Sequence, residues 1–190
     1  EELPDEDILM VDIGGGGLAA GVAQCAKQIN PNIKIIGVEP EGAQCMKEAL
    51  KFGKPVELSK VSTIADGTAV KLAGQRTFEL LNGVIDEIVT VSDYELMDAF
   101  LVLVEKHKLI AETSGILTLA GLQKIKEKGK KVVSIVSGGN IDVLTISSMI
   151  TKGLVSRGRI FSFSVDLTDK PGELVKVSEI LSTQNANVIK

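Results

Sequence analysis

The chain has 190 residues, of which 44% are hydrophobic and 24% charged, so its composition excludes global disorder and fits one globular domain or slightly more. The net charge of −4 and the aromatic content of 3% provide neither a basic surface nor stacking rings, so we expect no nucleic-acid partner. No run reaches the ~18 apolar residues of a membrane span, so we expect no membrane partner. Two cysteines without metal or redox spacing indicate a cytoplasmic protein.

Short apolar runs alternate with longer amphipathic runs through most of the chain. We expect strands at 8–13, 34–38, 87–91 and 132–136. Between and after them we expect helices at 18–29, 43–52, 69–81, 93–109, 114–128 and 142–154, with a capping box formed by Ser92 and Glu95. Buried strands that alternate with helices predict an α/β fold, with a parallel sheet covered by helices on both faces.

The pattern changes after Arg159. Apolar residues alternate with polar ones from 160 to 167, which indicates a strand with one exposed face. A turn at 169–172 and a helix at 173–181 follow. We place a domain boundary near 157, which gives units 1–157 and 158–190. The second unit is too short for a core of its own, so we expect a piece of a longer protein.

A run of glycines, Gly14 to Gly17, followed by Leu18, lies between the first expected strand and the first expected helix. Glycines allow backbone N–H groups to surround a phosphate, and the helix N-terminus attracts its charge. The alternative is a flexible turn. The spacing Gly14-x-Gly16-x-x-Ala19, with Glu39 about 20 residues further on, also fits a dinucleotide fingerprint. This segment alone therefore leaves the choice of ligand open.

A second glycine-containing turn, Ser137-Gly-Gly-Asn140, follows the expected strand at 132–136. A hydroxyl at the carboxyl end of a strand is well placed for a flat ring that lies over the sheet edge. Because open α/β sheets bind ligands at the carboxyl ends of their strands, we expect both turns to contribute to one site.

Over residues 1–156 the chain resembles the pyridoxal-phosphate-dependent threonine/serine ammonia-lyases (threonine dehydratases), of which serine racemase is a close relative. The resemblance rests on five short motifs in the family's order, which are Gly14–Leu18, Val38–Pro40, Thr63–Gly67, Glu112–Gly115 and Ser137–Asn140. It implies the later half of a catalytic domain with the tryptophan-synthase-β-like fold of fold type II pyridoxal-phosphate enzymes.

The resemblance also implies a site for pyridoxal 5′-phosphate. The backbone of the glycine run would hold the phosphate, and Ser137 would hydrogen-bond the pyridine nitrogen. A neutral hydroxyl there tempers the ring as an electron sink, which suits β-elimination. Glu112 has the alternative role of a carboxylate at a helix N-terminus. The positions that match the family's cofactor contacts are Gly14, Gly15, Gly16, Gly17, Leu18, Gly67, Glu112 and Ser137.

The implied activity is β-elimination and deamination of L-threonine to 2-oxobutanoate and ammonia, with serine as a second amino-acid substrate, in a homo-oligomer (dimer or tetramer). The family's Schiff-base lysine lies in an early Ser/Thr-Phe-Lys motif, which does not occur in this chain, so we expect the chain alone to be inactive. The alternatives are serine racemase or another fold type II enzyme, a dinucleotide-binding regulatory domain, and an amino-acid-binding module without a cofactor.

A cation site is a further implication of the resemblance. Relatives bind a cation through positions that match Glu39, the carbonyl of Ala43, and an acidic residue where this chain has Cys45. A thiol is a poor ligand for a hard cation, so the alternative for Glu39 is a carboxylate at a strand end that faces water.

The tail from Ile160 resembles the opening of an ACT domain, an amino-acid sensor. Its turn at Asp169, Pro171 and Gly172 would bind an amino-acid effector, which we expect to be a branched-chain amino acid such as isoleucine. The alternative is a β-α extension with a packing role only.

Overall fold

The structure, a computed structural model, describes residues 6–188. The chain divides into two units, one that ends at Arg159 and one that begins at Ile160. Among the described residues, no helix combines the length and the apolar character that a membrane crossing requires.

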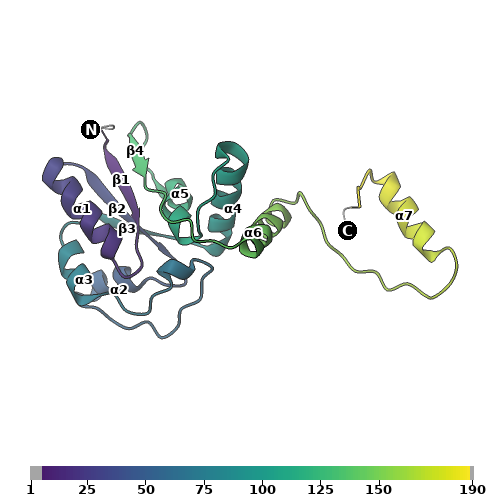
Figure 1. Cartoon of the computed structure of the whole chain (residues 1–190), viewed down its shortest axis with the longest axis horizontal. Coiled ribbons are helices and arrows are strands. Elements are labelled where there is room, and N and C mark those ends of the chain that lie inside the picture. The colour runs from purple at the N-terminus through teal and green to yellow at the C-terminus, as the bar shows by residue number, and fades with distance from the viewer. Residues whose placement is uncertain (1–5, 189–190) are drawn as a thin grey trace. The chain divides into compact units, whose positions relative to one another are not determined.

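A four-stranded sheet forms the centre of the first unit (Figure 1). Every pair of neighbouring strands is parallel, so all the strands end at the same edge. Every residue of the strand that begins at Ile8 is buried, as expected for a strand inside a sheet covered on both faces. In spatial order the strands are β3 (Glu87–Val91), β2 (Lys34–Pro40), β1 (Ile8–Asp12) and β4 (Val132–Ser134).

Helices cover both faces of this sheet, as Figure 1 shows. Leu9 and Val11 of β1 pack into a core with one set of helices, whereas Ile8 and Met10 pack into a core with the other set. The predicted α/β fold, with a parallel sheet between two helical layers, is confirmed. The first layer holds α1 (Gly17–Ile29), α2 (Cys45–Phe52) and α3 (Gln75–Leu81); the second holds α4 (Asp93–Val102), α5 (Leu117–Gly121) and α6 (Val143–Ser156).

The helix expected at 69–81 is wrong in its first half, because α3 begins only at Gln75. A 3-10 turn at Asp66–Thr68 precedes it. The carbonyl of Lys71 then accepts a hydrogen bond from the N–H of Leu58, 2.8 Å away, instead of closing a helical turn. Pairing with a distant segment therefore replaces the first turns of the expected helix.

Other expected elements are also shorter in the structure. The helix expected at 93–109 turns π-helical over Leu103–His107 and stops at Lys108, whose φ of 58° is left-handed. The helix expected at 114–128 is α-helical only over α5, has 3-10 turns at both ends, and is followed by extended backbone at Ile125. The fourth strand ends at Ser134, two residues early, because the chain there leaves the ladder to form the Ser137 turn.

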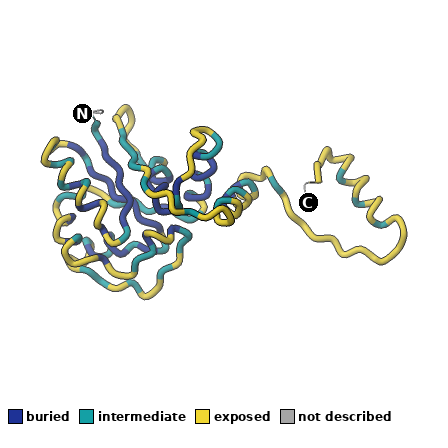
Figure 2. Tube along the Cα trace, viewed as in Figure 1, coloured by how far each residue is buried: buried dark blue, intermediate teal, exposed yellow. Residues whose placement is uncertain are grey.

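The second unit contains α7 (Glu173–Thr183), which follows the expected turn and is two residues longer than expected. The strand expected at 160–167 is not formed, and the second unit has no strand within residues 160–188. A strand needs a partner for its N–H and C=O groups, and this segment has none. Figure 2 shows residues 161–167 exposed. The rings of Phe161 and Phe163 stack on each other, with 5.6 Å between their centroids.

Candidate active site

The glycine run forms the turn between β1 and α1. Gly16 adopts the left-handed conformation, with φ of 90°, and no side chain caps the helix that follows it. A Cβ atom at this position would lie 2.7 Å from Cε of Met46 and 3.0 Å from Oγ1 of Thr77. Glycine is therefore required here, because the backbone is left-handed and because a side chain would have no room.

The same turn is open toward solvent. Gly15 and Gly17 are exposed, and a Cβ atom at either would meet nothing within 4 Å. Leu18, in the first turn of α1, is 45% exposed. The first N–H groups of a helix have no partner within the helix, so the turn presents free donors at the positive end of α1. These residues fit an anionic group such as a phosphate.

The two motifs Glu112–Gly115 and Ser137–Asn140 lie side by side. The N–H of Ser137 donates to the carbonyl of Gly115 over 3.1 Å, and the N–H of Glu112 donates to the carbonyl of Gly138 over 3.3 Å. A Cβ atom on Gly115 would lie 1.3 Å from the carbonyl oxygen of Ser137. Only glycine permits this contact, which fixes Ser137 relative to Glu112.

Gly67 joins these motifs to the glycine run. A Cβ atom on Gly14 would lie 3.3 Å from the carbonyl oxygen of Gly67, and a Cβ atom on Gly67 would lie 3.6 Å from Oε1 of Glu112. The structure thus brings Gly14, Gly67, Glu112 and Ser137 to one place, at the carboxyl edge of the sheet. Loops that pack against these glycines thus bring together residues that lie more than 100 positions apart in the sequence.

Asp12, the last residue of β1, belongs to this cluster, although the sequence analysis did not predict it as a site residue. The hydroxyl of Ser137 donates a hydrogen bond to Oδ1 of Asp12 over 3.0 Å. Asp12 is only 9% exposed. Burial raises the pKa of its carboxyl; the Ser137 bond opposes this rise, and the charge of Glu112 adds to it. A carboxylate that ends an otherwise apolar strand was the signal that could have found it.

Ser114 also lies at the cluster. Its Oγ is 2.9 Å from the position of a Cβ atom on Gly67. This oxygen is buried and has no hydrogen-bond partner within the described chain. A buried hydroxyl without a partner is unusual, and a ligand with a polar group would satisfy it. The open turn and this hydroxyl together fit a ligand that carries an anionic group and a further polar group.

Glu39 has a structural role that the sequence did not indicate. It is fully buried, and its two carboxylate oxygens accept hydrogen bonds from the N–H groups of Met46 (2.8 Å) and Lys47 (2.9 Å) at the start of α2. Burial raises the pKa of this carboxyl to about 7, although the two backbone bonds lower it. The expectation that Glu39 faces water is therefore wrong.

The expected cation site at Glu39 and Ala43 stays a prediction. Ala43 is buried, and its N–H donates to the carbonyl of Pro40. The thiol of Cys45 donates to the carbonyl of Gly14 over 3.4 Å. Among the residues that the structure describes, no group of three or more His, Cys, Asp or Glu side chains could hold a metal ion. Backbone carbonyls would have to supply most of the ligands.

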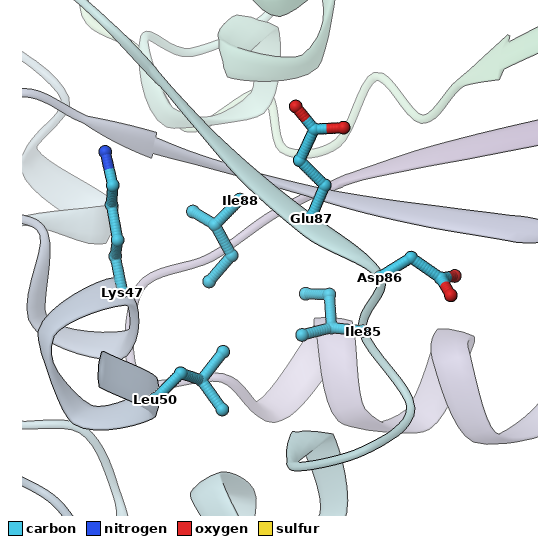
Figure 3. Close-up of a pocket in the computed structure, with 6 residues that line it drawn as sticks. All are labelled: Lys47, Leu50, Ile85, Asp86, Glu87 and Ile88. Atoms are coloured by element: carbon cyan, nitrogen blue, oxygen red, sulfur yellow. The ribbon is translucent and has the colours of Figure 1, made fainter. Parts of the chain in front are cut away.

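A shallow pocket lies away from these residues, between α2 and the start of β3. Figure 3 shows Lys47 and Glu87 on opposite sides of Ile88, and Leu50 and Ile85 complete the lining together with Asp86. None of the predicted site residues lines this pocket. Its lining offers no group of polar atoms directed at a common point, so we assign no function to it.

The expected effector residues lie in the second unit. Asp169, Pro171 and Gly172 are exposed. Gly172 is left-handed, with φ of 93°, and it precedes α7 without a side-chain cap. The turn and the helix N-terminus thus have the expected form, and the role in effector binding stays a prediction.

The fold and the site together define an α/β protein whose parallel sheet carries, at its carboxyl edge, a site that fits an anionic ligand. Residues 1–138 match the model of the family described as pyridoxal-phosphate dependent enzyme. The chain belongs to this family. Pyridoxal phosphate is accordingly its cofactor, and the dinucleotide that the glycine spacing also allowed is set aside.

Among curated proteins, the chain is 42% identical over 190 residues to an L-threonine ammonia-lyase of Thermotoga maritima, covering 100% of this chain and 47% of that protein. It is 40% identical to an L-threonine ammonia-lyase of Geobacter sulfurreducens, over 99% of this chain and 47% of the relative. The chain thus spans about half the length of these two relatives.

Solved structures give the same family. The processed form of threonine deaminase isoform 2 from Solanum lycopersicum has a TM-score of 0.73 and 40% identity, over 79% of this chain and 45% of that one. Maize serine racemase has a TM-score of 0.71 and 34% identity, over 80% of this chain and 49% of that one. These likenesses confirm the expected fold of the first unit.

Proposed function

We propose that the full-length protein is a pyridoxal-phosphate-dependent ammonia-lyase that converts L-threonine, with serine as a second substrate, to a 2-oxo acid and ammonia. Threonine would give 2-oxobutanoate. The observation that carries this proposal is the convergence of Gly14, Gly67, Glu112 and Ser137 at one edge of the sheet. Two threonine ammonia-lyases that match the chain over nearly its whole length support the choice of substrate.

The residues of this chain would bind and orient the cofactor. The free N–H groups of the turn Gly14–Leu18 would hold its phosphate, and Ser137 would contact its ring nitrogen. Glu112 and Ser114 would line the ring between these two ends. When bound, the cofactor supplies the electron sink for proton loss at the α-carbon of the amino acid. The chain itself contributes binding and electrostatics rather than a covalent group.

The test is turnover of L-threonine by the full-length protein, followed as formation of 2-oxobutanoate and ammonia. Ser137→Ala should lower turnover by more than tenfold at saturating cofactor. The melting temperature should change little, since the Ser137 side chain forms one hydrogen bond and its backbone bond to Gly115 is kept. Racemisation of L-serine without deamination would contradict the proposal and favour the serine racemase alternative. Unchanged turnover in Ser137→Ala would contradict the role of the hydroxyl.

We further propose that the second unit belongs to an amino-acid-sensing ACT domain of a cytoplasmic homo-oligomer. A free carboxylate, such as that of isoleucine, would bind the N–H groups at Gly172. Isoleucine titration by calorimetry on the full-length protein, and on a version that ends at Ser156, tests this. We expect binding to the full-length protein only, and its loss in Gly172→Val with unregulated turnover retained. Equal binding to both versions would place the effector site elsewhere.

A further inference from the structure

Four charged side chains form an ion-pair network at the end of the first unit. Arg157 donates from Nε to Oδ1 of Asp98 over 2.6 Å and from Nη2 to the backbone carbonyl of Asp98 over 3.3 Å. Its Nη1 lies 3.6 Å from Oε2 of Glu105, and Arg159 pairs with the other oxygen of Glu105. Arg157 thus joins two acidic residues, and Glu105 joins two arginines.

The backbone that carries the two arginines is fixed by the end of α6. Gly158 is left-handed, with φ of 65°. Its N–H donates to the carbonyl of Val155, and the N–H of Arg159 donates to the carbonyl of Leu154, each over 2.9 Å. These two bonds form the Schellman motif that ends many helices. Helix α6 lies beside α4 (Figure 1), and a Cβ atom on Gly153 would lie 2.7 Å from a side chain of α4. The network therefore adds polar contacts to two helices that already pack together.

Glu105 lies in an irregular segment of the chain. Residues Leu103–His107 form a π-helix, which stops at Lys108 in the left-handed conformation. The ammonium group of Lys108 donates to the carbonyl of Glu105 over 2.7 Å. π-helices are rare and are found frequently at functional sites. Because a π-helical turn holds one residue more than an α-helical turn, conversion of one into the other shifts the chain that follows.

The chain after this π-helix leads into the candidate active site. Four residues, 108–111, separate the π-helix from Glu112, whose N–H donates to the carbonyl of Gly138 over 3.3 Å. In the other direction the network includes Arg159, the last residue of the first unit, which is bonded to Ile160, the first residue of the second. The network therefore lies between the point where the second unit begins in the chain and a residue of the site.

We propose that this network is a conformational switch that couples the second unit to the candidate active site: its ion pairs hold the π-helix, and their release lets the segment that ends at Glu112 shift. This inference rests on the proposed function, because it needs an effector that binds the second unit. A change of backbone conformation at Ile160 reaches Arg159 first, since the two residues are adjacent, and it alters the pairing of Glu105.

The shared partners make such a network suitable for this role. Its side chains are partly exposed, and an exposed ion pair contributes little by itself. Here the loss of one contact affects the others, because Glu105 is held by two arginines and Arg157 holds two acidic residues. A small displacement at Arg159 therefore weakens several contacts together.

The first arm of the test needs no effector. Hydrogen exchange of the backbone amides of residues 103–111 is followed by mass spectrometry in the full-length protein and in Glu105→Gln, which removes the charge and keeps the size of the side chain. We expect exchange in this segment to be about fivefold faster in the variant. The control is Glu127→Gln, which removes an exposed ion pair with Lys34 outside the network and should leave this exchange unchanged. Equal exchange in the native protein and in Glu105→Gln would overturn the proposal.

The second arm measures the coupling. The apparent affinity of the full-length protein for L-threonine is determined with and without saturating isoleucine, and the ratio of the two values is the coupling factor. We expect a factor of about five or more in the native protein and a factor within about twofold of one in Glu105→Gln and Arg159→Gln. Turnover without isoleucine, and the Kd of isoleucine without threonine, should stay as in the native protein. Arg159→Lys, which keeps the charge, should retain most of the coupling.

The outcomes separate the failures. If isoleucine does not bind the native full-length protein, the proposed sensing role fails, and this inference fails with it. If isoleucine binds and shifts threonine affinity by the same factor in the native protein and in Glu105→Gln, the sensing role stands and the role of the network is overturned. A network that only secures the end of α6 would lower the melting temperature of Glu105→Gln and leave the factor unchanged, which also contradicts the proposal.

Discussion

The helices α1 and α2 each follow a neighbouring strand of the sheet, yet their N-termini differ in what they bind. At α2 the two oxygens of the buried Glu39 accept hydrogen bonds from Met46 and Lys47. At α1 the first turn begins at Gly16, and no side chain accepts from it. The protein's own carboxylate occupies one N-terminus, and the other is left for a ligand's anion.

The remaining helices that follow strands support this distinction. Ser92 caps α4 and Asp142 caps α6, each through a side-chain oxygen that accepts a backbone N–H. Among the described helices that directly follow a strand of the sheet, α1 thus stands apart in lacking an acceptor from the protein. A helix N-terminus without a cap costs stability, and the binding of a phosphate there would recover it.

Removing the buried carboxyl group of Glu39 should have the largest effect. Glu39→Ala leaves the N–H groups of Met46 and Lys47 buried without acceptors, so we expect a loss of about 4 kcal/mol in the free energy of unfolding. The measurement is urea unfolding at pH 5 with a chelator present. Glu48→Ala, which breaks an exposed pair with Lys51 on the same helix, is the control and should cost less than about 1 kcal/mol. Equal losses in the two variants would contradict the capping role.

The buried carboxylate also predicts a pH dependence. The pKa of Glu39 rises from 4.5 to about 7 on folding, so the folded state binds this proton more tightly than the unfolded state. Stability from this group is complete below pH 4.5 and is lost as the pH rises to 7, by about 3 kcal/mol for a difference of about 2.5 in pKa. Cys45 and Lys47 also face this carboxyl. The hydrogen bond of Cys45 and the charge of Lys47 lower its pKa, by less than burial raises it.

Glu39→Gln is the matched variant for this titration, because glutamine has nearly the same shape but takes up no proton. Its unfolding free energy should change less between pH 4.5 and 7 than that of the native protein. Asp12, whose pKa is also raised, titrates in both proteins and cancels in the comparison. Parallel curves for the native protein and the variant would show that Glu39 is ionised throughout this range.

The open N-terminus is tested by crowding it. Gly16→Val places a branched side chain on a left-handed residue and against Met46 and Thr77, so we expect the affinity of the full-length protein for pyridoxal phosphate to fall about 30-fold, or ~2 kcal/mol. The control is Gly53→Val. Gly53 is also left-handed, with φ of 70°, but it follows the C-terminal end of α2, where a Cβ atom would meet nothing within 4 Å. This variant should lower stability and leave cofactor affinity unchanged. Equal affinities in both variants would move the phosphate site away from α1.

The fold was predictable where the pattern was local. Runs such as residues 8–11 are apolar on both faces and specify a strand inside a covered parallel sheet. The helix expected at 69–81 was wrong because Lys71 pairs with Leu58, a contact that periodicity does not reveal. The strand expected at 160–167 needs partner strands that residues 160–188 do not contain. The residues of each segment favour a helix or a strand, and hydrogen bonding with distant segments decides whether that element forms.

The site was predictable only as a set of motifs. The glycine turn and Ser137 were found because small residues at strand ends are visible in the sequence. The roles of Asp12 and Glu39 were missed, because a carboxylate at the end of a strand can face water, a ligand or a helix N-terminus. The choice depends on the register between β1 and β4 for Asp12 and on where α2 begins for Glu39. Neither the register of these strands nor the start of α2 can be inferred from the residues next to Asp12 or Glu39.

The smallest effect is expected at a cap that serves only the fold. Ser92 and Glu95 form a reciprocal capping box, in which the Ser92 oxygen accepts from the N–H of Glu95 over 3.3 Å and the Glu95 carboxylate accepts from the N–H of Ser92 over 2.7 Å. Ser92→Ala should lower the unfolding free energy by about 1 kcal/mol, and Ser92→Gly by only a few tenths. Because α4 already has its acceptor within the chain, cofactor affinity should be the same in both variants as in the native protein. Urea unfolding and cofactor titration of the same samples check both statements. A loss of cofactor affinity in Ser92→Ala would mean that capped helices also contribute to the site, and the contrast between α1 and the capped helices would no longer hold.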